Sequence, residues 1–230
     1  QQTVTLQRSY DNPVAIAFVA TENGRDPVNV RISAVSGNDL TLLLQEPSNL
    51  NPSHGNERVN FLVMEAGTWI LPDGTLVEAG TLESDRLSTA GFEDVTFDAA
   101  FDSTPVVLSH VQTLNGRDFV TTRQRATNAD GFKLTMQEED AKNGSGHASE
   151  KIGWIALEAG SGFAGDVSWL AGSASGVTDA NSTVGLDAGL SNVVAGLSSY
   201  NGGDSAWVRG AGGTNTSFDV SVEEDTTADA

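Results

Sequence analysis

The sequence predicts an all-β protein made of tandem antiparallel β-sandwiches. Apolar residues alternate with polar ones over short segments, as in Leu40, Leu42 and Leu44, and this period of two is typical of a strand with one buried face. The 230 residues include 25 glycines and only 6 prolines, which favours short strands joined by tight turns. A long pattern also recurs three times, which indicates repeated structural units.

The repeat is anchored by the segment Asn23-Gly24-Arg25-Asp26. The anchor returns at position 115, 92 residues later, and at position 201, a further 86 residues on. These copies read Asn115-Gly116-Arg117-Asp118 and Asn201-Gly202-Gly203-Asp204, so the third has a glycine where the others have arginine. A second arginine follows each anchor at one fixed offset, as Arg31, Arg123 and Arg209. An apolar strand precedes each anchor, at residues 13–18, 105–108 and 193–197.

The strands after these arginines also correspond to one another. The counterparts of Leu40, Leu42 and Leu44 are Phe132, Leu134 and Met136, and then Phe218, Val220 and Val222. Each of these strands runs into acidic residues, at 45–46, 137–140 and 223–225. The first two copies continue through a His/Glu segment, at 54–57 and 147–150, and close with an apolar strand at 61–67 and 152–160. So many matches at equal offsets establish the repeat.

We place the three units at residues 1–68, 74–161 and 164–230 and expect a six-stranded sandwich from each. A leading strand opens the second and third units, at 76–82 and 167–172. The first unit lacks this leading strand and the third lacks the closing strand, so only the middle unit is expected to be complete. Two explanations stay open. Either the chain is a piece of a longer array, which we favour, or neighbouring chains supply the absent strands by β-augmentation.

Composition excludes several classes of function. With 12 basic and 31 acidic residues the formal net charge is −19, which repels nucleic acid and anionic membranes. No apolar run approaches the roughly 18 residues of a membrane-spanning helix, and the first residues do not read as a signal peptide. The absence of cysteine excludes disulfides, thiol chemistry and thiolate metal sites. The charge also fits a source in salty water, where ions screen the repulsion.

The second copy contains Val95-Thr96-Phe97 with Phe101, then Pro105-Val106-Val107, the segment 129–134, and Gly153-Trp154-Ile155-Ala156. In this order they resemble an H-type lectin domain, the module of snail agglutinins and of the C-terminal part of discoidins, over about residues 76–160. The resemblance implies a six-stranded antiparallel sandwich that forms trimers and binds galactose or N-acetylgalactosamine at protomer boundaries.

Three tandem copies would imitate such a trimer within one chain. The first copy departs from the second by having Phe61 where the second has Trp154. The third departs at Gly203, which replaces the anchor arginine, so this copy is expected to bind sugar least well.

The anchor loops are the first candidates for a carbohydrate site. Their polar residues are Asn23, Arg25 and Asp26, then Asn115, Arg117 and Asp118, and finally Asn201 and Asp204. Asparagine and aspartate exchange hydrogen bonds with vicinal hydroxyls, and arginine adds a planar fork of donors. The alternative, which we favour, is that each anchor is a hairpin turn, because Asn-Gly is a strong turn signal and the arginine and aspartate can pair at the surface.

The arginines Arg31, Arg123 and Arg209 lie in the middle of predicted strands. We expect them to pair with the acidic end of a neighbouring strand, such as Glu46 or Glu138; the alternative is that they donate hydrogen bonds to a ligand.

Aromatic and histidine side chains complete the candidate ligand set. Of the four tryptophans, at 69, 154, 169 and 207, we expect Trp154 in the core and Trp207 exposed, where its ring could stack on a sugar. His54 and His147 precede the closing strands in a polar turn, so we expect both to be solvated. Contact between His147 and a sugar is the alternative.

The acidic runs at 138–140 and 223–225 are expected to be solvated strand ends, with Ca²⁺ binding as the weaker alternative because no EF-hand or Gly-Asp pattern is present. No Ser-His-Asp spacing, His-Glu-x-x-His motif or phosphate loop occurs. The acids recur with the repeat, whereas a glycosidase pair would be unique. We therefore predict no enzyme and no cofactor.

These observations predict a non-catalytic extracellular, cell-surface or virion-surface protein that recognises carbohydrate weakly at each site and gains from several sites together. Its partners would be glycans or polysaccharide, without nucleic acid and without a membrane span. The alternative is a structural subunit of a surface filament, sheath or virion fibre, a homo-oligomer assembled by strand exchange through open strand edges.

Overall fold

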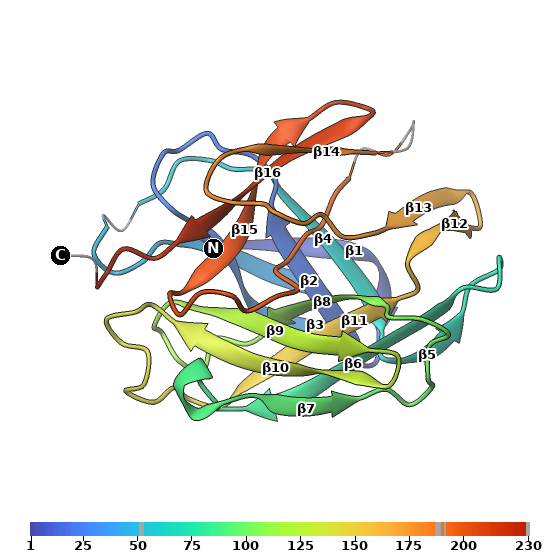
Figure 1. Ribbon diagram of the computed structural model, residues 1–230, viewed down its shortest axis with the longest axis horizontal. Coiled ribbons are helices and arrows are strands. Elements are labelled where there is room, and N and C mark those ends of the chain that lie inside the picture. The colour runs from blue at the N-terminus through green and yellow to red at the C-terminus, as the bar shows by residue number, and fades with distance from the viewer. Residues whose placement is uncertain (51–52, 187–189, 191, 229–230) are drawn as a thin grey trace.

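The computed structural model describes residues 1–50, 53–186, 190 and 192–228 (Figure 1). Within this part of the chain the regular secondary structure consists of strands and one short 3₁₀ turn, η1 (Ser88–Ala90), as the alternating sequence predicts. The strands are β1 (Gln2–Tyr10), β2 (Pro13–Val19), β3 (Asn29–Gln45), β4 (Val59–Glu65), β5 (Gly67–Ile70), β6 (Leu76–Ser84), β7 (Glu93–Thr96), β8 (Val106–Val111), β9 (Val120–Asn128), β10 (Gly131–Glu138), β11 (Glu150–Leu157), β12 (Gly160–Ala164), β13 (Val167–Ala171), β14 (Ser182–Gly185), β15 (Ala206–Gly213) and β16 (Ser217–Glu224). No helix in the described chain is long and apolar enough to cross a membrane.

The second unit is a complete sandwich. Its front sheet has the strand order β7-β10-β9 and its back sheet the order β5-β6-β11-β8, and all neighbouring strands are antiparallel. Phe97, Phe132 and Trp154 pack against one another between the sheets, with ring centroids 5.7–5.8 Å apart. Trp154 is therefore a core residue, as predicted. The strand β5 crosses the expected unit boundary at residue 68 and gives this unit seven strands instead of six.

The three front sheets repeat one another in register. Val4 of β1 pairs with Leu40 of β3, Val95 pairs with Phe132, and Val184 of β14 pairs with Phe218 of β16. In the first unit β3 alone covers the positions of both β9 and β10. Within β3, Gly37 has a φ of +57°, a left-handed conformation that glycine tolerates. The repeat seen in the sequence is thus a repeat of backbone pairing.

The three units pack against one another around a common centre instead of forming separate domains in a row. In β2, Ala15, Ala17 and Val19 face the core of their own unit, whereas Val14 and Ile16 face a cluster with the second unit. Phe18 lies 5.8 Å from the ring of Phe218 in the third unit. The equivalent segments 16–18, 108–110 and 195–197 line one small cavity, and β2 and β8 lie near the centre of Figure 1.

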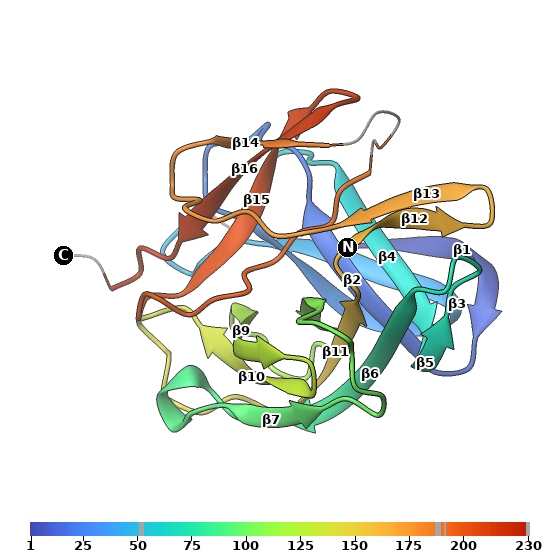
Figure 2. The same ribbon diagram turned by 45° about the vertical axis from the view of Figure 1, so that its right-hand side comes forward.

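The back sheets of the outer units are smaller than that of the second. In the first unit, β4 pairs only with β2, whereas its counterpart β11 lies between β6 and β8. In the third unit, residues 193–197 form no strand, and β13 pairs only with β12. Figure 2 shows the β12–β13 hairpin projecting from the body of the molecule. Within the described residues, the first and third units are incomplete, as the sequence predicts.

Candidate functional site

The most elaborate polar cluster of the second unit surrounds the buried carboxylate of Glu150, the first residue of β11. The backbone N–H groups of Asn115 and Gly116 donate to this carboxylate at 2.8–3.1 Å, and the hydroxyl of Thr113 donates as well. The anchor loop therefore wraps around an acid that comes from the start of the closing strand. We call this arrangement the anchor seat of the second unit.

An arginine from the first unit completes the seat. Arg31, in the middle of β3, is 2% exposed, and its guanidinium donates to Glu150 at 2.8 Å. The same guanidinium donates to the carbonyl oxygens of Thr113, Gly116 and Asp118 at 3.3–3.4 Å. The prediction of an ion-paired arginine agrees with this contact, but the partner is not Glu46 of its own unit. The acid belongs to the next unit, so the pair joins two units.

His147 closes the seat from the other side. Its side chain is 1% exposed and lies between two carboxylates, with Nδ1 against Glu138 and Nε2 3.2 Å from Glu150. The ring fits because residue 116 is glycine: a Cβ there would lie 2.5 Å from Nε2 of His147, closer than real contacts allow. The expectation of a solvated histidine was wrong, because the two acids compensate for the loss of water around the ring.

The first unit has the same seat, built by equivalent residues. Asn23, Gly24 and Thr21 donate to the buried Glu57, and His54 lies between Glu46 at 2.6 Å and Glu57 at 3.1 Å. The arginine of this seat comes from the third unit: Arg209 donates to Glu57 at 2.7 Å and to the carbonyl oxygens of Thr21, Gly24 and Asp26 at 2.9–3.2 Å. Each seat thus takes its arginine from a different unit.

Hydrogen bonding controls the ionisation of the two central acids. Burial alone would raise the pKa of Glu57, but bonds from Thr21, Gly24, Asn23 and His54 outweigh burial and lower the pKa to about 2. The pKa of Glu150 is lowered to about 2 in the same way, by His147, Thr113, Gly116 and Asn115, against the opposing effect of burial.

The pKa of His147 moves in the opposite direction. Burial would lower it, but the bonds to Glu150 and Glu138 raise it. A seat therefore holds an ionised acid against an arginine and a histidine near neutral pH.

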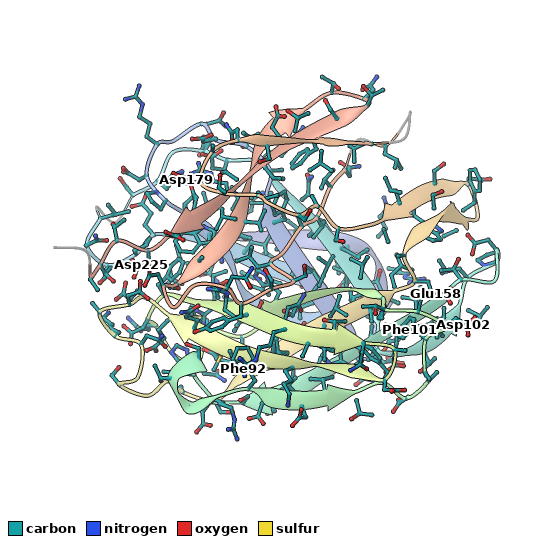
Figure 3. The ribbon with its side chains drawn as sticks, viewed as in Figure 1. Phe92, Phe101, Asp102, Glu158, Asp179 and Asp225 are labelled. Atoms are coloured by element: carbon teal, nitrogen blue, oxygen red, sulfur yellow. The ribbon has the colours of Figure 1, made fainter. Side chains whose placement is uncertain are left out.

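The third copy holds the arginine without the rest of the seat. Arg123 of β9, 3% exposed, donates to the carbonyl oxygen of Asp204 at 2.9 Å and to Oε1 of Gln137 at 2.6 Å. Its guanidinium carbon lies 4.7 Å from the centre of the Tyr200 ring, and Tyr200 also contacts the ring of Phe92, labelled in Figure 3. Among the described residues, the side chain of Asn201 donates only to Ser199, at 3.5 Å.

The anchor arginines lie on the outside of the seats. Arg25 and Arg117 are both exposed, and neither guanidinium makes a hydrogen bond or ion pair within the described chain. Asp118 accepts an ion pair from Lys142 at 2.6 Å instead of pairing with Arg117. The side chain of Gln45 in the first unit donates to the carbonyl oxygen of Arg117 at 2.9 Å. This loop therefore lies at a boundary between units.

Two further expectations about side chains were wrong. Trp207 is 4% exposed: its ring lies 4.8 Å from Phe119 and its Nε1 donates to the carbonyl oxygen of Val28, so no face is free to stack on a sugar. Glu138 and Glu139 are fully buried instead of solvated: the carboxylate of Glu138 contacts the His147 ring, and that of Glu139 pairs with Lys142 at 2.8 Å and accepts hydrogen bonds from Ser48. No group of three or more potential metal-ligating side chains occurs in the described ranges.

Glu57 and Glu150 were missed as central residues by sequence reasoning. The signal was present, because His54-x-x-Glu57 and His147-x-x-Glu150 recur at matching offsets before the two closing strands. The motif did not reveal that its acid would be enclosed by the anchor loop of its own unit and the arginine of another. Such pairings depend on how the units pack.

Comparison with known proteins gives one informative similarity. No protein-family model matches the sequence, and no solved structure matches it. The chain is 30% identical over 237 aligned residues to halomucin of Haloquadratum walsbyi, in an alignment that includes 97% of the chain. The chain spans only about 2% of the length of this curated relative, so it is similar to one short stretch of halomucin.

Proposed function

We propose that the chain is a non-catalytic structural module of an extracellular surface protein that joins further units of the same kind by strand pairing at its outer units. The observation that carries this proposal is the pair of free strand edges at β4 and β13. In the second unit the corresponding strands, β11 and β6, pair over eight residues, from Glu150 with Ser84 to Leu157 with Val77. Within the described chain, β4 and β13 each lack that partner.

The side chains beside these edges support association. Phe61 and Leu62 of β4 are 38% and 41% exposed, and Val167 and Leu170 of β13 are 66% and 40% exposed. Exposed apolar side chains next to unpaired backbone N–H and C=O groups are the combination that pairs with another strand, unless charged or covering residues prevent it. The β13 edge of one molecule and the β4 edge of another are therefore complementary.

The similarity to halomucin supports an extracellular surface location, since the relative's name places it with mucins. The formal charge of −19 is consistent with such a surface, which would repel nucleic acid and anionic lipid. A role in building the surface also explains why the recurring buried groups join units together instead of meeting in one catalytic constellation.

Light scattering over a range of protein concentrations tests this proposal. We expect the mass to rise above the 24.0 kDa of one chain as concentration increases. The variant Leu62→Lys should reduce the association, because a lysine on an edge strand opposes pairing. Ser103→Lys, an exposed loop position away from both edges, is the control and should associate like the parent chain. A parent chain that stays monomeric at every concentration would contradict the proposal.

Carbohydrate recognition is the second candidate function. The observation that favours it is the exposed guanidinium of Arg117, which has no partner among the described residues. It lies on an anchor loop at a unit boundary, where the resemblance to H-type lectins implies that sugar binds. The buried Arg31, Arg123, Arg209, His147 and Trp207 support packing and leave Arg25 and Arg117 as the available donors. Binding would be weak at each loop and would gain from several loops.

A glycan array with the whole chain tests this second function, because the units share their seats and are unsuitable for separate assay. We expect Arg117→Ala to lose binding and Arg8→Ala, an exposed arginine of β1, to keep it. Equal binding by Arg117→Ala and the parent chain would mean that the anchor loop is only a turn.

A further inference from the structure

We infer that the anchor seat of the third unit is a binding site for a His-x-x-Glu strand segment of a further repeat unit, with Arg123 as the receptor for its glutamate. This inference rests on the proposed structural function and names the segment that would join the third unit. The two complete seats within the same chain serve as templates for what is absent from the third.

Arg123 provides the first observation. In each complete seat, one Nη donates to the carbonyl oxygen of the anchor aspartate, and Arg123 does the same toward Asp204. In both complete seats Nε donates to a backbone carbonyl oxygen and Nη2 donates to the seat carboxylate. Among the described residues, Nε of Arg123 is buried without a hydrogen-bond partner, and the hydrogen bonds of its guanidinium all come from Nη1. A buried guanidinium that is only partly satisfied has a strong preference for a carboxylate.

The anchor loop of the third unit offers the matching backbone donors. The N–H groups of Asn115 and Gly116, and of Asn23 and Gly24, all donate to the seat glutamate. Their counterparts in Asn201 and Gly202 have no acceptor within the described residues. Within the described chain, the third loop therefore has two free N–H groups at the same two positions, Asn and Gly, that bind the glutamate in the other loops.

Space for the histidine is also present. A Cβ on Gly24 or Gly116 would meet Nε2 of His54 or His147 at 2.6 and 2.5 Å, whereas a Cβ on Gly202 would meet no atom within 4 Å. Glu224 corresponds to Glu46 and Glu138, the acids that hold Nδ1 of these histidines. Glu224 is exposed, and its side chain makes no hydrogen bond or salt bridge in the part of the chain that the structure describes. The glycine that leaves room for the histidine ring and the acid that would bind its Nδ1 are thus both present in the third unit.

The occupant follows from these three features. It carries a carboxylate for Arg123 and the loop N–H groups, and three residues earlier an imidazole for the space over Gly202 beside Glu224. It continues as an apolar strand, because β13 and residues 193–197 are the repeat counterparts of β6 and β8, which flank the apolar strand β11 in the second unit. Residues 144–157 of this chain have all these properties and represent the class.

Fluorescence anisotropy with a labelled peptide of residues 144–157 tests the inference on the whole chain. We expect saturable binding. Peptides carrying Glu150→Gln or His147→Ala should bind at least about tenfold more weakly, because each loses a charged contact in a largely buried seat. These changes are in the peptide, so they leave the folding of the protein untouched.

A pair of protein variants separates the third seat from any exchange of the peptide with β11. Gly202→Val fills the open space over the anchor and should abolish peptide binding, while the neighbouring Gly203→Val, also in open space, should bind like the parent chain. Circular dichroism and the thermal midpoint should be unchanged in both. Equal binding by the Gly202→Val chain, equal binding of the Glu150→Gln peptide, or no binding at about 1 mM peptide would overturn the inference.

Failure of this site can be distinguished from failure of the proposed function. A chain that stays monomeric but binds the peptide would refute association between chains and support the third seat. A chain that associates through β4 but ignores the peptide would refute the seat and leave the structural function in place.

Discussion

The guanidinium of Arg209 lies 2.7 Å from the carboxylate of Glu57, although 152 residues separate them in sequence. Both side chains are almost completely buried, and the contact connects the last unit to the first. Arg31 connects the first unit to the second, and Arg123 connects the second to the third. The three units therefore form a closed cycle in which each gives one arginine and receives another.

Removing the charge of a seat glutamate should destabilise the whole chain. Glu150→Gln leaves Arg31 and His147 buried without their full counter-charge, so we expect the free energy of unfolding to fall by about 3–5 kcal/mol. Glu57→Gln should behave alike. Urea denaturation followed by tryptophan fluorescence measures the effect. Asp94→Asn, which breaks the exposed ion pair with Lys133, should cost less than about 1 kcal/mol. Similar losses from the buried and exposed pairs would contradict the assignment.

Acid should remove the same stabilisation. The pKa values of Glu57 and Glu150 are lowered from 4.5 to about 2 in the folded chain. Because the folded values lie below the unfolded ones, this stability is complete above pH 4.5 and is lost as the pH falls toward 2. Each acid contributes about 3 kcal/mol by this linkage. Urea midpoints measured from pH 7 to 2 should fall steeply in that window, and less steeply in Glu150→Gln.

His147 should make stability depend on pH in the opposite direction, with a loss as the pH rises. Its pKa is raised in the folded chain, above the ordinary value of 6.5. The contribution to stability is therefore complete below about pH 6.5 and decreases as the pH rises through the folded pKa. In His147→Gln, the urea midpoint should lose this decline on the alkaline side. In NMR spectra of the native state, the His147 resonance is identified by its absence from His147→Gln, which separates it from His110, whose burial lowers its pKa to about 4. A His147 resonance that titrates below 6.5 would show that the assigned sign is wrong.

Substituting the anchor glycine by alanine should lower stability in the second unit, where a histidine packs on it, but not in the third. Gly116→Ala places a methyl group 2.5 Å from Nε2 of His147, so the ring must leave the seat, and we expect a loss of about 1–3 kcal/mol. Gly202→Ala, at the equivalent position of the third unit, meets open space and should be neutral within about 0.5 kcal/mol. Thermal unfolding of both variants gives the comparison. Equal losses would mean that the steric contact with His147 does not matter.

Salt should stabilise the chain. The formal charge of −19 repels itself in the folded state, and ions screen that repulsion. We expect the thermal midpoint to rise when NaCl increases from about 0.1 to about 2 M. The variant Glu150→Gln should show a similar rise, because its seat is buried and poorly screened. A midpoint that falls with salt would indicate that exposed ion pairs, such as Lys142 with Asp118, dominate over the net repulsion.

The sequence predicted the all-β class, the three units and the incomplete outer ones because these depend on local alternation and on matched offsets. The pairing of Val4 with Leu40 and of its two counterparts follows from that pattern. The destination of Arg31 could not be predicted, because its partner Glu150 lies in another unit and the contact depends on how units pack. His147 and Trp207 were misjudged because polar neighbours in sequence indicated solvent. His147 is instead enclosed by Glu138 and Glu150 of its own unit, and Trp207 by Phe119 and Val28 of the other two units.

The cycle of arginines also has a consequence for the order of events during synthesis. Glu57 and its histidine leave the ribosome early, but Arg209 follows only 152 residues later. At typical translation rates this interval is on the order of 10–30 seconds. During that time Glu57 of the first unit lacks its ion pair with Arg209, so the first unit is not yet fully stabilised. On a translating ribosome the first unit should therefore become resistant to proteolysis only after the second unit, although it is synthesised before that unit.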